Sequence, residues 1–280
     1  MAVTLIAAAG WLFSKNALAT FPPFIFIALR FCLAAFVLCC LSRHALAALT
    51  SSEIKRACAT GCVLGVTILV WVIGLQRIQS IGEGAFLVSL TIVLVPLISK
   101  LLFADKIPRI LILALCPAIA GLAFLTLDNG FQFEPAQLYF LAATLGFALH
   151  ITLSSHLVAN IPVLPNSAIQ LTMTGLLAVI AAFLTESWPE TTSVSAWSWV
   201  LASAIIATSF RFTLQNRALQ SLKPSHASMI FILEPVWTAL LGASFLGERL
   251  TFFQIIGCAL IFTSLVVFRW RMVSQFLGRA

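Results

Sequence analysis

Residues 22–42 read PPFIFIALRFCLAAFVLCCLS, a run of 21 residues in which Arg30 carries the only charge. A helix of about 20 apolar residues is long enough to cross the hydrocarbon core of a bilayer, which is about 30 Å thick. Pro22 and Pro23 mark a turn before the run. This stretch therefore predicts a membrane-spanning helix with one arginine inside it.

The rest of the chain has the same character. Of its 280 residues, 61% are hydrophobic and only 9% are charged, and the mean hydropathy is +1.08. A soluble domain has about 25% charged residues. Sixteen basic and nine acidic residues cannot cover a soluble fold of this size. The composition excludes a soluble globular protein, a disordered chain and a disulfide-rich secreted scaffold, and it predicts an integral membrane protein.

Short turns, such as Asp128-Asn129-Gly130 and Trp188-Pro189, separate ten apolar runs. The predicted fold class is therefore an all-α polytopic membrane protein with ten transmembrane helices. The first run has no basic start and contains Lys15, so we interpret it as a span and not as a cleaved signal peptide. We place the spans at residues 1–19, 22–42, 57–76, 80–103, 108–128, 136–158, 164–185, 194–216, 224–247 and 251–271.

The basic residues predict the orientation. If the N-terminus is cytoplasmic, eleven Lys and Arg residues fall on the cytoplasmic side and only Arg77 and Arg249 fall outside. Such a bias is typical of bacterial inner-membrane proteins, whose cytoplasmic loops are rich in Lys and Arg. We therefore expect a multi-pass inner-membrane protein with both termini in the cytoplasm. The eleven residues are Arg43, Lys55, Arg56, Lys100, Lys106, Arg109, Arg217, Lys223, Arg269, Arg271 and Arg279.

An internal repeat divides the chain into residues 1–130 and 131–280. The segment LQRIQS at 75–80 resembles NRALQS at 216–221, and each leads into a span that contains a proline, Pro96 or Pro235. Five spans per half is an odd number, so the second repeat is predicted to be inverted in the membrane. Inverted repeats are typical of transporters, in which the binding site lies at the interface between repeats near the bilayer midplane.

Residues 232–260 contain Leu233-Glu234-Pro235, the turn Gly247-Glu248-Arg249 and Gly257 in the last span. This pattern resembles the end of an EamA-type domain of the drug/metabolite transporter superfamily. Residues 86–97 and the triplet Leu29-Arg30-Phe31 resemble the matching parts of the first domain, so the resemblance covers the whole chain. The first repeat departs from the pattern at Ala104-Asp105-Lys106, where we expect an altered helix cap.

The resemblance implies ten helices around a central cavity, lined by the first, third and fourth helix of each repeat, with the fifth helices at the periphery. It also implies export of small metabolites, often amino acids. One subgroup of similar size comprises the YddG-type aromatic amino-acid exporters.

Charges within a bilayer are costly and usually face a partner or a wet cavity. Helical spacing places Lys15 on one stripe with Trp11, and Arg211 on one stripe with Thr208 and Gln215. Polar groups on these stripes and aromatic side chains on neighbouring spans form the predicted site. The predicted substrate-binding residues are Trp11, Lys15, Trp71, Phe86, Ser89, His150, Arg211, Gln215, Glu234 and Trp237.

We expect Lys15 or Arg211 to meet a substrate carboxylate, and Glu234 or a carbonyl freed at Pro235 to meet its ammonium. Structural interpretations remain open. Lys15 can snorkel to the lipid headgroups, and Arg30 can pair with a helix end or a carboxylate. His150 is a buried hydrogen-bonding group or, with Glu234, a proton-coupling group.

Two further patterns concern helix geometry. Pro96 and Pro235 are candidate hinges for alternating access or inert bends. Gly61 and Gly65 form a GxxxG motif, which favours close helix packing. The seven cysteines lie in or beside apolar runs, and we expect them to be buried free thiols.

The sequence thus predicts a secondary transporter that exports apolar or aromatic amino acids, or similar metabolites, by alternating access. The alternatives are a multidrug or nucleotide-sugar-type exchanger and a multispan membrane enzyme. We find no motif for a nucleotide, a cofactor, a metal or a catalytic group. The expected partners are a small-molecule substrate and the lipid bilayer, without nucleic acid, in a monomer or weak homodimer.

The predicted topology can be tested by labelling single cysteines in a cysteine-free background in intact cells. A membrane-impermeant maleimide should label position 130 from outside, and position 110 only after the membrane is permeabilised. These positions flank the span predicted at 108–128. Labelling of both positions from one side would contradict the topology on which the inverted repeat depends.

Overall fold

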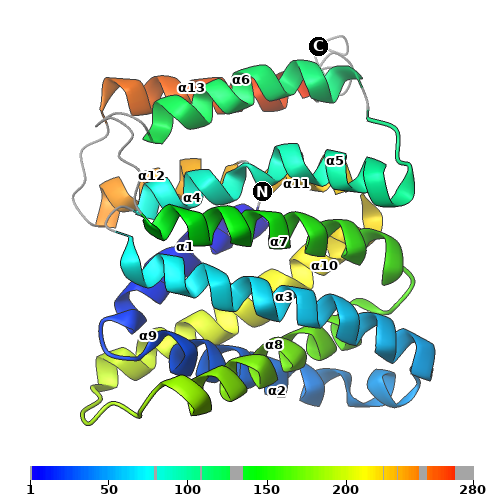
Figure 1. Cartoon of the computed structure of the whole chain (residues 1–280), viewed down its shortest axis with the longest axis vertical. Coiled ribbons are helices and arrows are strands. Elements are labelled where there is room, and N and C mark those ends of the chain that lie inside the picture. Colours follow the sequence, from blue (N-terminus) through cyan, green and yellow to red (C-terminus); the bar gives the residue numbers. More distant parts are fainter. Residues whose placement is uncertain are drawn as a thin grey trace, which may run out of the picture.

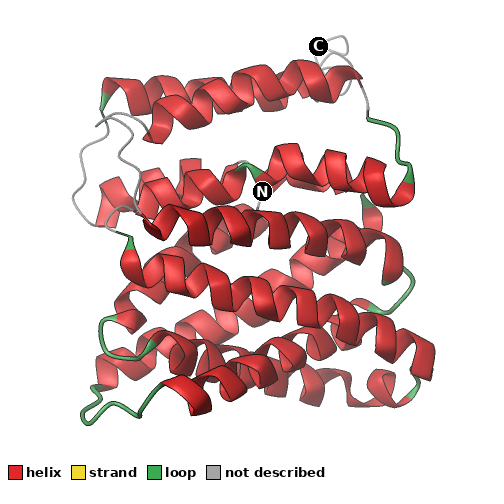
Figure 2. Cartoon of the chain, viewed as in Figure 1, coloured by secondary structure: helices red, strands yellow, loops and turns green. Residues whose placement is uncertain are grey.

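The computed structural model describes residues 2–78, 81–107, 109–126, 135–222, 224–231, 233–245 and 251–268. Every regular element within these ranges is helical (Figure 2). The predicted all-α fold class is thus confirmed.

The first half of the chain contains six helical segments. They are α1 (Ala2–Leu18), α2 (Pro23–Ala47), α3 (Ser51–Arg77), α4 (Ile81–Ser89), α5 (Thr91–Phe103) and α6 (Arg109–Thr126). The second half contains α7 (Pro135–Leu157), α8 (Val163–Thr185), α9 (Val194–Ala204), the π-helix η1 (Ile205–Phe210), α10 (Arg211–Ser221), α11 (Pro224–Phe231), α12 (Leu233–Phe245) and α13 (Phe252–Phe268).

Each predicted span corresponds to one helix or to consecutive helical segments. The largest shift of a helix start is in α3, which begins at Ser51 and not at 57. Its first turn is polar, and a capping box supplies the hydrogen bonds that hydropathy does not reveal. Thr50 Oγ1 accepts a bond from the Glu53 amide, and the Glu53 carboxylate accepts one from the Thr50 amide at 2.8 Å. The Thr50 hydroxyl also donates to the Glu53 carboxylate, at 2.7 Å.

Three predicted spans are not single α-helices. The span at 80–103 is divided into α4 and α5 at Leu90, and the span at 224–247 is divided into α11 and α12. The span at 194–216 continues to Ser221 and contains the π-helix η1 between α9 and α10. Interrupted helices are tolerated in a membrane protein where the freed backbone groups are buried in protein or line a wet cavity.

The surface of the bundle fits a lipid environment. Five helical stretches of the described chain are long and apolar enough to cross a membrane: Pro23–Ala47, Ser51–Arg77, Pro135–Leu157, Val163–Thr185 and Val194–Ser221. The remaining predicted spans are shorter or interrupted within the described residues. Large apolar side chains point outward, with Phe36, Leu101 and Phe183 exposed by 69, 83 and 86%. A soluble monomer rarely exposes apolar residues so extensively.

The helices run back and forth across the bundle, as Figure 1 shows. The fifth helices of the two halves, α6 and α13, pack together at one end, and the second helices, α2 and α8, pack together at the other. α4 contacts α12 and α5 contacts α11, so the two divided spans cross in antiparallel directions. Corresponding helices of the two halves therefore run in opposite directions.

The departure from the family pattern at Ala104 lies at a helix cap, where the sequence places it. Ala104 is the C-cap of α5 and has a φ of 56°, in the left-handed region that favours glycine. Its amide still donates to the carbonyl of Lys100 at 3.1 Å. The next residue, Asp105, accepts a hydrogen bond from Ser99 and lies 3.1 Å from His156 Nε2.

All seven cysteines are free thiols, but the expectation that they are buried is wrong. Cys32, Cys40 and Cys116 are exposed, and the other four are partly exposed. Because the exposed surface of these helices is apolar, a thiol in contact with lipid needs no polar partner.

Gly61 and Gly65 allow α3 to approach α8 closely. A Cβ atom at Gly61 would lie 2.9 Å from the Cα of Gln170, and one at Gly65 would lie 3.1 Å from the Cα of Thr174. These neighbours are backbone atoms, so they cannot rotate away. The GxxxG motif serves helix packing inside the bundle, as predicted.

We expect Gly61→Val to destabilise the protein by about 1–3 kcal/mol, the range typical of overpacking. The measurement is the thermal unfolding midpoint of the purified protein in detergent. Ala59→Val is the matched control, because Ala59 lies two residues away on the exposed side of α3. Equal midpoints for the two variants would contradict the close contact.

Candidate functional site

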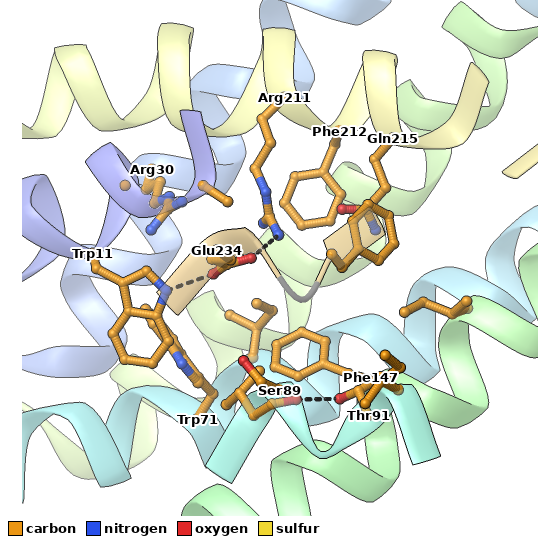
Figure 3. Close-up of a pocket in the computed structure, with 17 residues that line it drawn as sticks. Trp11, Arg30, Trp71, Ser89, Thr91, Phe147, Arg211, Phe212, Gln215 and Glu234 are labelled. Atoms are coloured by element: carbon orange, nitrogen blue, oxygen red, sulfur yellow. Dashed lines mark hydrogen bonds and ion pairs between the residues drawn. The ribbon is translucent and has the colours of Figure 1, made fainter. Parts of the chain in front are cut away.

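A cavity lies near the middle of the bundle (Figure 3). The space open to the centres of water molecules is about 80 Å³, enough for a few waters. Its lining combines apolar, aromatic and charged side chains. The lining residues are Ala7, Gly10, Trp11, Arg30, Ile68, Trp71, Val88, Ser89, Thr91, Ile92, Phe147, Ile151, Arg211, Phe212, Gln215, Phe231 and Glu234.

Almost all of these residues come from the first, third and fourth spans of each half, the helices that the family resemblance implies. No lining residue comes from the described parts of α6 or α13. The exception is Arg30, the one lining residue from a second helix, α2.

Glu234 connects two other polar groups of the cavity. Its Oε1 accepts a hydrogen bond of 2.6 Å from the indole Nε1 of Trp11. Its Oε2 lies 3.9 Å from Nη2 of Arg211, at the long limit of an ion pair. Figure 3 shows the carboxylate between the tryptophan and the arginine. A ligand ammonium could therefore compete for Glu234 without breaking a short ion pair.

The start of α12 explains why an acid and a proline occur together in the middle of a span. Glu234 lies in the first turn of α12, where the positive end of the helix dipole favours a carboxylate. Pro235 lies in the same turn, where the amide that proline lacks would have no helical partner. The carbonyl predicted to be free near Pro235 stays a prediction, because the end of α11 adjoins residue 232, which lies outside the described residues.

Arg30 is 5% exposed and binds only neutral groups among the described residues. Its Nε donates to Thr208 Oγ1 at 2.5 Å, Nη1 donates to Ser14 Oγ at 2.9 Å, and Nη2 donates to the carbonyl of Ala207 at 3.3 Å. Pairing with a carboxylate, one of the two interpretations of Arg30 open from the sequence, is not seen among these residues. The guanidinium instead joins α2 to α1 and to η1.

The π-helix η1 changes which residues face the cavity. Thr208 Oγ1 donates to Ser203 O at 2.8 Å and Ser209 Oγ donates to Ala204 O at 3.0 Å, both five residues back. This wider turn directs Thr208 toward Arg30, while Arg211 and Gln215 line the cavity. Of the predicted stripe of Thr208, Arg211 and Gln215, the last two line the cavity, whereas Thr208 binds the lining residue Arg30.

Aromatic rings form much of the cavity wall. The rings of Trp11 and Trp71 meet edge to face with centroids 5.0 Å apart. The guanidinium of Arg211 lies over the ring of Phe212 at 4.9 Å. Phe147 and Phe231 complete the aromatic part of the lining. Such walls suit an apolar or aromatic ligand group and also attract cations.

Six of the ten predicted binding residues line the cavity: Trp11, Trp71, Ser89, Arg211, Gln215 and Glu234. Three others lie elsewhere in the structure. Lys15 is partly exposed on α1, His150 is fully buried between helices, and Trp237 donates to Thr4 Oγ1 at 3.1 Å. The side chain of Phe86 lies outside the described residues.

His150 belongs to a separate buried polar cluster. Its Nε2 lies 3.2 Å from Ser154 Oγ and 3.4 Å from Gln170 Oε1. Gln170 Nε2 donates to Thr60 Oγ1 at 3.0 Å, and Asn216 Nδ2 donates to Gln170 Oε1 at 3.2 Å. The cluster joins α3, α7, α8 and α10, and none of these five residues lines the cavity.

Sequence reasoning missed several lining residues. It identified Arg30 as an intramembrane charge but did not assign it to the site, although its isolation within an apolar run was a usable signal. Phe147, Phe212 and Phe231 carry no such signal, because the chain has 23 phenylalanines and most of them serve packing or lipid contact.

The fold and the cavity define a polytopic helical membrane protein in which three intramembrane charges, Arg30, Arg211 and Glu234, converge inside the bundle. The profile of the EamA-like transporter family matches residues 1–127 and 135–270. The chain belongs to this family, and it is a membrane transporter of the drug/metabolite superfamily.

Relatives support this assignment. The chain is 25% identical over 273 residues to the uncharacterized transporter YoaV of Bacillus subtilis, an alignment that covers 93% of this chain and 92% of that protein. It is 29% identical over 202 residues to an uncharacterized transporter of Archaeoglobus fulgidus, covering 71% of this chain and 64% of the relative. A solved crystal structure with 18% identity has the same fold, with a TM-score of 0.79 and coverage of 98% of this chain and 97% of that one.

Proposed function

We propose that the protein exports amino acids with apolar or aromatic side chains across the bacterial inner membrane by alternating access. The observation that carries this proposal is the cavity itself, in which two guanidinium groups and one carboxylate lie among aromatic walls. A zwitterion with an apolar side chain matches each of these elements. Its carboxylate meets an arginine, its ammonium meets Glu234, and its side chain packs against the rings.

The proposed mechanism uses two repeats, residues 1–130 and 131–280, inverted relative to each other in the membrane. The opposite directions of corresponding helices and the antiparallel crossing of the divided fourth spans support it. Exchange of the two repeat conformations would open the cavity alternately to each side. The division at Leu90 borders the cavity, and Pro96 and Pro235 stay candidates for hinges.

The proposed orientation places both termini in the cytoplasm. The turns after α2, α5 and α10 lie at the same end of the bundle (Figure 1), and these are turns to which the positive-inside bias assigns the cytoplasmic side. Substrate would then enter from that end and leave at the opposite one. The driving force is a gradient of substrate or of protons.

Substrate counterflow tests the proposal directly. Purified protein is reconstituted into liposomes loaded with one unlabelled amino acid, and uptake of the same labelled amino acid is measured. We expect internal phenylalanine, tryptophan or leucine to accelerate uptake relative to unloaded vesicles, because an exchanging carrier returns loaded. Acceleration by none of the twenty amino acids would overturn the proposed substrate class.

The two predicted cationic residues should differ in this assay. We expect Arg211→Met to lower the initial rate by about tenfold or more, because it removes a charge-assisted partner from the cavity. Lys15→Met should change the rate by less than about twofold, because Lys15 does not line the cavity. The amount and the unfolding midpoint of each reconstituted variant serve as controls. An equal loss in both variants would contradict the placement of the site.

A further inference from the structure

Arg30 carries a full charge into the interior of the bundle without an acidic partner among the described side chains. Its three hydrogen bonds go to two hydroxyls and one carbonyl. A buried charge that lacks an opposite charge is costly unless water or a ligand approaches it. Arg30 is also one of the cavity-lining residues, so such an approach is open.

The guanidinium retains donors for a ligand. An arginine has five N–H groups in a fixed planar fork, and the three bonds of Arg30 use one N–H on each nitrogen. One N–H on Nη1 and one on Nη2 therefore remain. Each of these N–H groups can donate a charge-assisted hydrogen bond to a carboxylate.

The other arginine of the cavity is in a different situation. Arg211 lies 3.9 Å from Glu234, so its charge is partly balanced within the protein. Among the described lining residues, the two arginines thus face one carboxylate. The excess positive charge belongs to Arg30, and it favours a ligand that brings a negative group.

A comparison of Arg30 with the equivalent residue of the second repeat distinguishes a structural role from a binding role. Arg30 follows the N-cap residue Pro22 of α2 by eight positions, and Gln170 follows the N-cap residue Pro162 of α8 by eight positions. Arg30 binds Ser14, sixteen residues earlier, at 2.9 Å. Gln170 makes the equivalent contact in the second repeat.

That contact runs from Gln170 Nε2 to Ser154 Oγ, also sixteen residues earlier, at 3.5 Å. Each side chain then reaches the third span of the opposite half, Thr208 for Arg30 and Thr60 for Gln170. An uncharged amide therefore holds the three equivalent spans together in the second repeat. The contact between spans does not require a charge, so the charge of Arg30 calls for another explanation.

We propose that Arg30 binds the substrate carboxylate and makes a carboxylate the essential recognition element of the cavity, whereas an ammonium is dispensable. This inference rests on the proposed function, and it names the group that the site requires. It extends the substrate class to monocarboxylates that carry an apolar or aromatic group. It also disfavours purely cationic ligands, despite the aromatic walls.

The test compares two probes that each retain half of the zwitterion. 3-Phenylpropionate keeps the carboxylate and the ring, and phenethylamine keeps the ammonium and the ring. Binding to the purified full-length protein is followed by tryptophan fluorescence, because Trp11 and Trp71 line the cavity. We expect the wild-type protein to bind 3-phenylpropionate about tenfold or more tightly than phenethylamine.

Arg30→Gln introduces the residue that occupies the equivalent position of the second repeat, so the fold should tolerate it. We expect this variant to bind 3-phenylpropionate about tenfold to a hundredfold more weakly and phenethylamine unchanged within about twofold. Arg30→Lys keeps the charge and should recover part of the affinity for the carboxylate. Gln170→Met is the matched control, which should lower the unfolding midpoint while leaving the preference for the carboxylate intact.

A folded Arg30→Gln variant that binds 3-phenylpropionate as the wild type does would overturn the inference. A wild-type protein that prefers phenethylamine would overturn it as well, and this result does not depend on how any variant folds. Amino-acid counterflow that is insensitive to Arg30 would leave the proposed function standing without this role. Carboxylate binding without counterflow by any amino acid would instead reject the proposed transport substrate and keep the anion site.

Discussion

The constraint on which the structure depends is that hydrocarbon cannot hydrogen-bond to a protein. Each backbone amide and carbonyl within the bilayer must be satisfied by the chain itself, which leaves helices as the building element of this bundle. Two irregular points of the described chain, the division at Leu90 and the π-helix η1, therefore lie inside it and adjoin the cavity or Arg30. The same constraint drives polar side chains inward and leaves Phe36, Leu101 and Phe183 on the lipid surface.

Charges follow the same rule at a higher energetic cost. The described cavity contains three of them, and each is held differently. Glu234 accepts from Trp11 and faces Arg211, Arg211 stacks over Phe212, and Arg30 uses neutral oxygens. The uneven pairing leaves an excess of positive charge in a space of about 80 Å³. A low-dielectric wall strengthens the field of that charge on any ligand that enters. The chain has few charged residues, and three of them determine the electrostatics of this cavity.

Hydropathy and turn residues were sufficient to predict the ten spans, because the bilayer imposes a length on each of them. The positions of single side chains were less predictable. Lys15 follows Trp11 by one helical turn, yet only Trp11 lines the cavity, because the tilt and rotation of α1 depend on its neighbours. The contact of Thr208 with Arg30 was not predicted, since it lies in a π-helix that the local sequence does not reveal. His150 was recognised as buried or functional, but only its contacts with Ser154 and Gln170 reveal a separate cluster.

The position of Glu234 and Pro235 in α12 lowers the free-energy cost of a carboxylate and a proline within a transmembrane span. In a continuous transmembrane helix, proline would remove a backbone hydrogen bond and clash with the preceding turn. In the middle of such a helix, a carboxylate would also gain no stabilisation from the helix dipole. Both penalties are smaller in the first turn of α12, since that turn has no amide partners to lose and its dipole favours an anion. The carboxylate in the cavity wall therefore has a lower free-energy cost in the first turn of α12 than it would have in an unbroken helix.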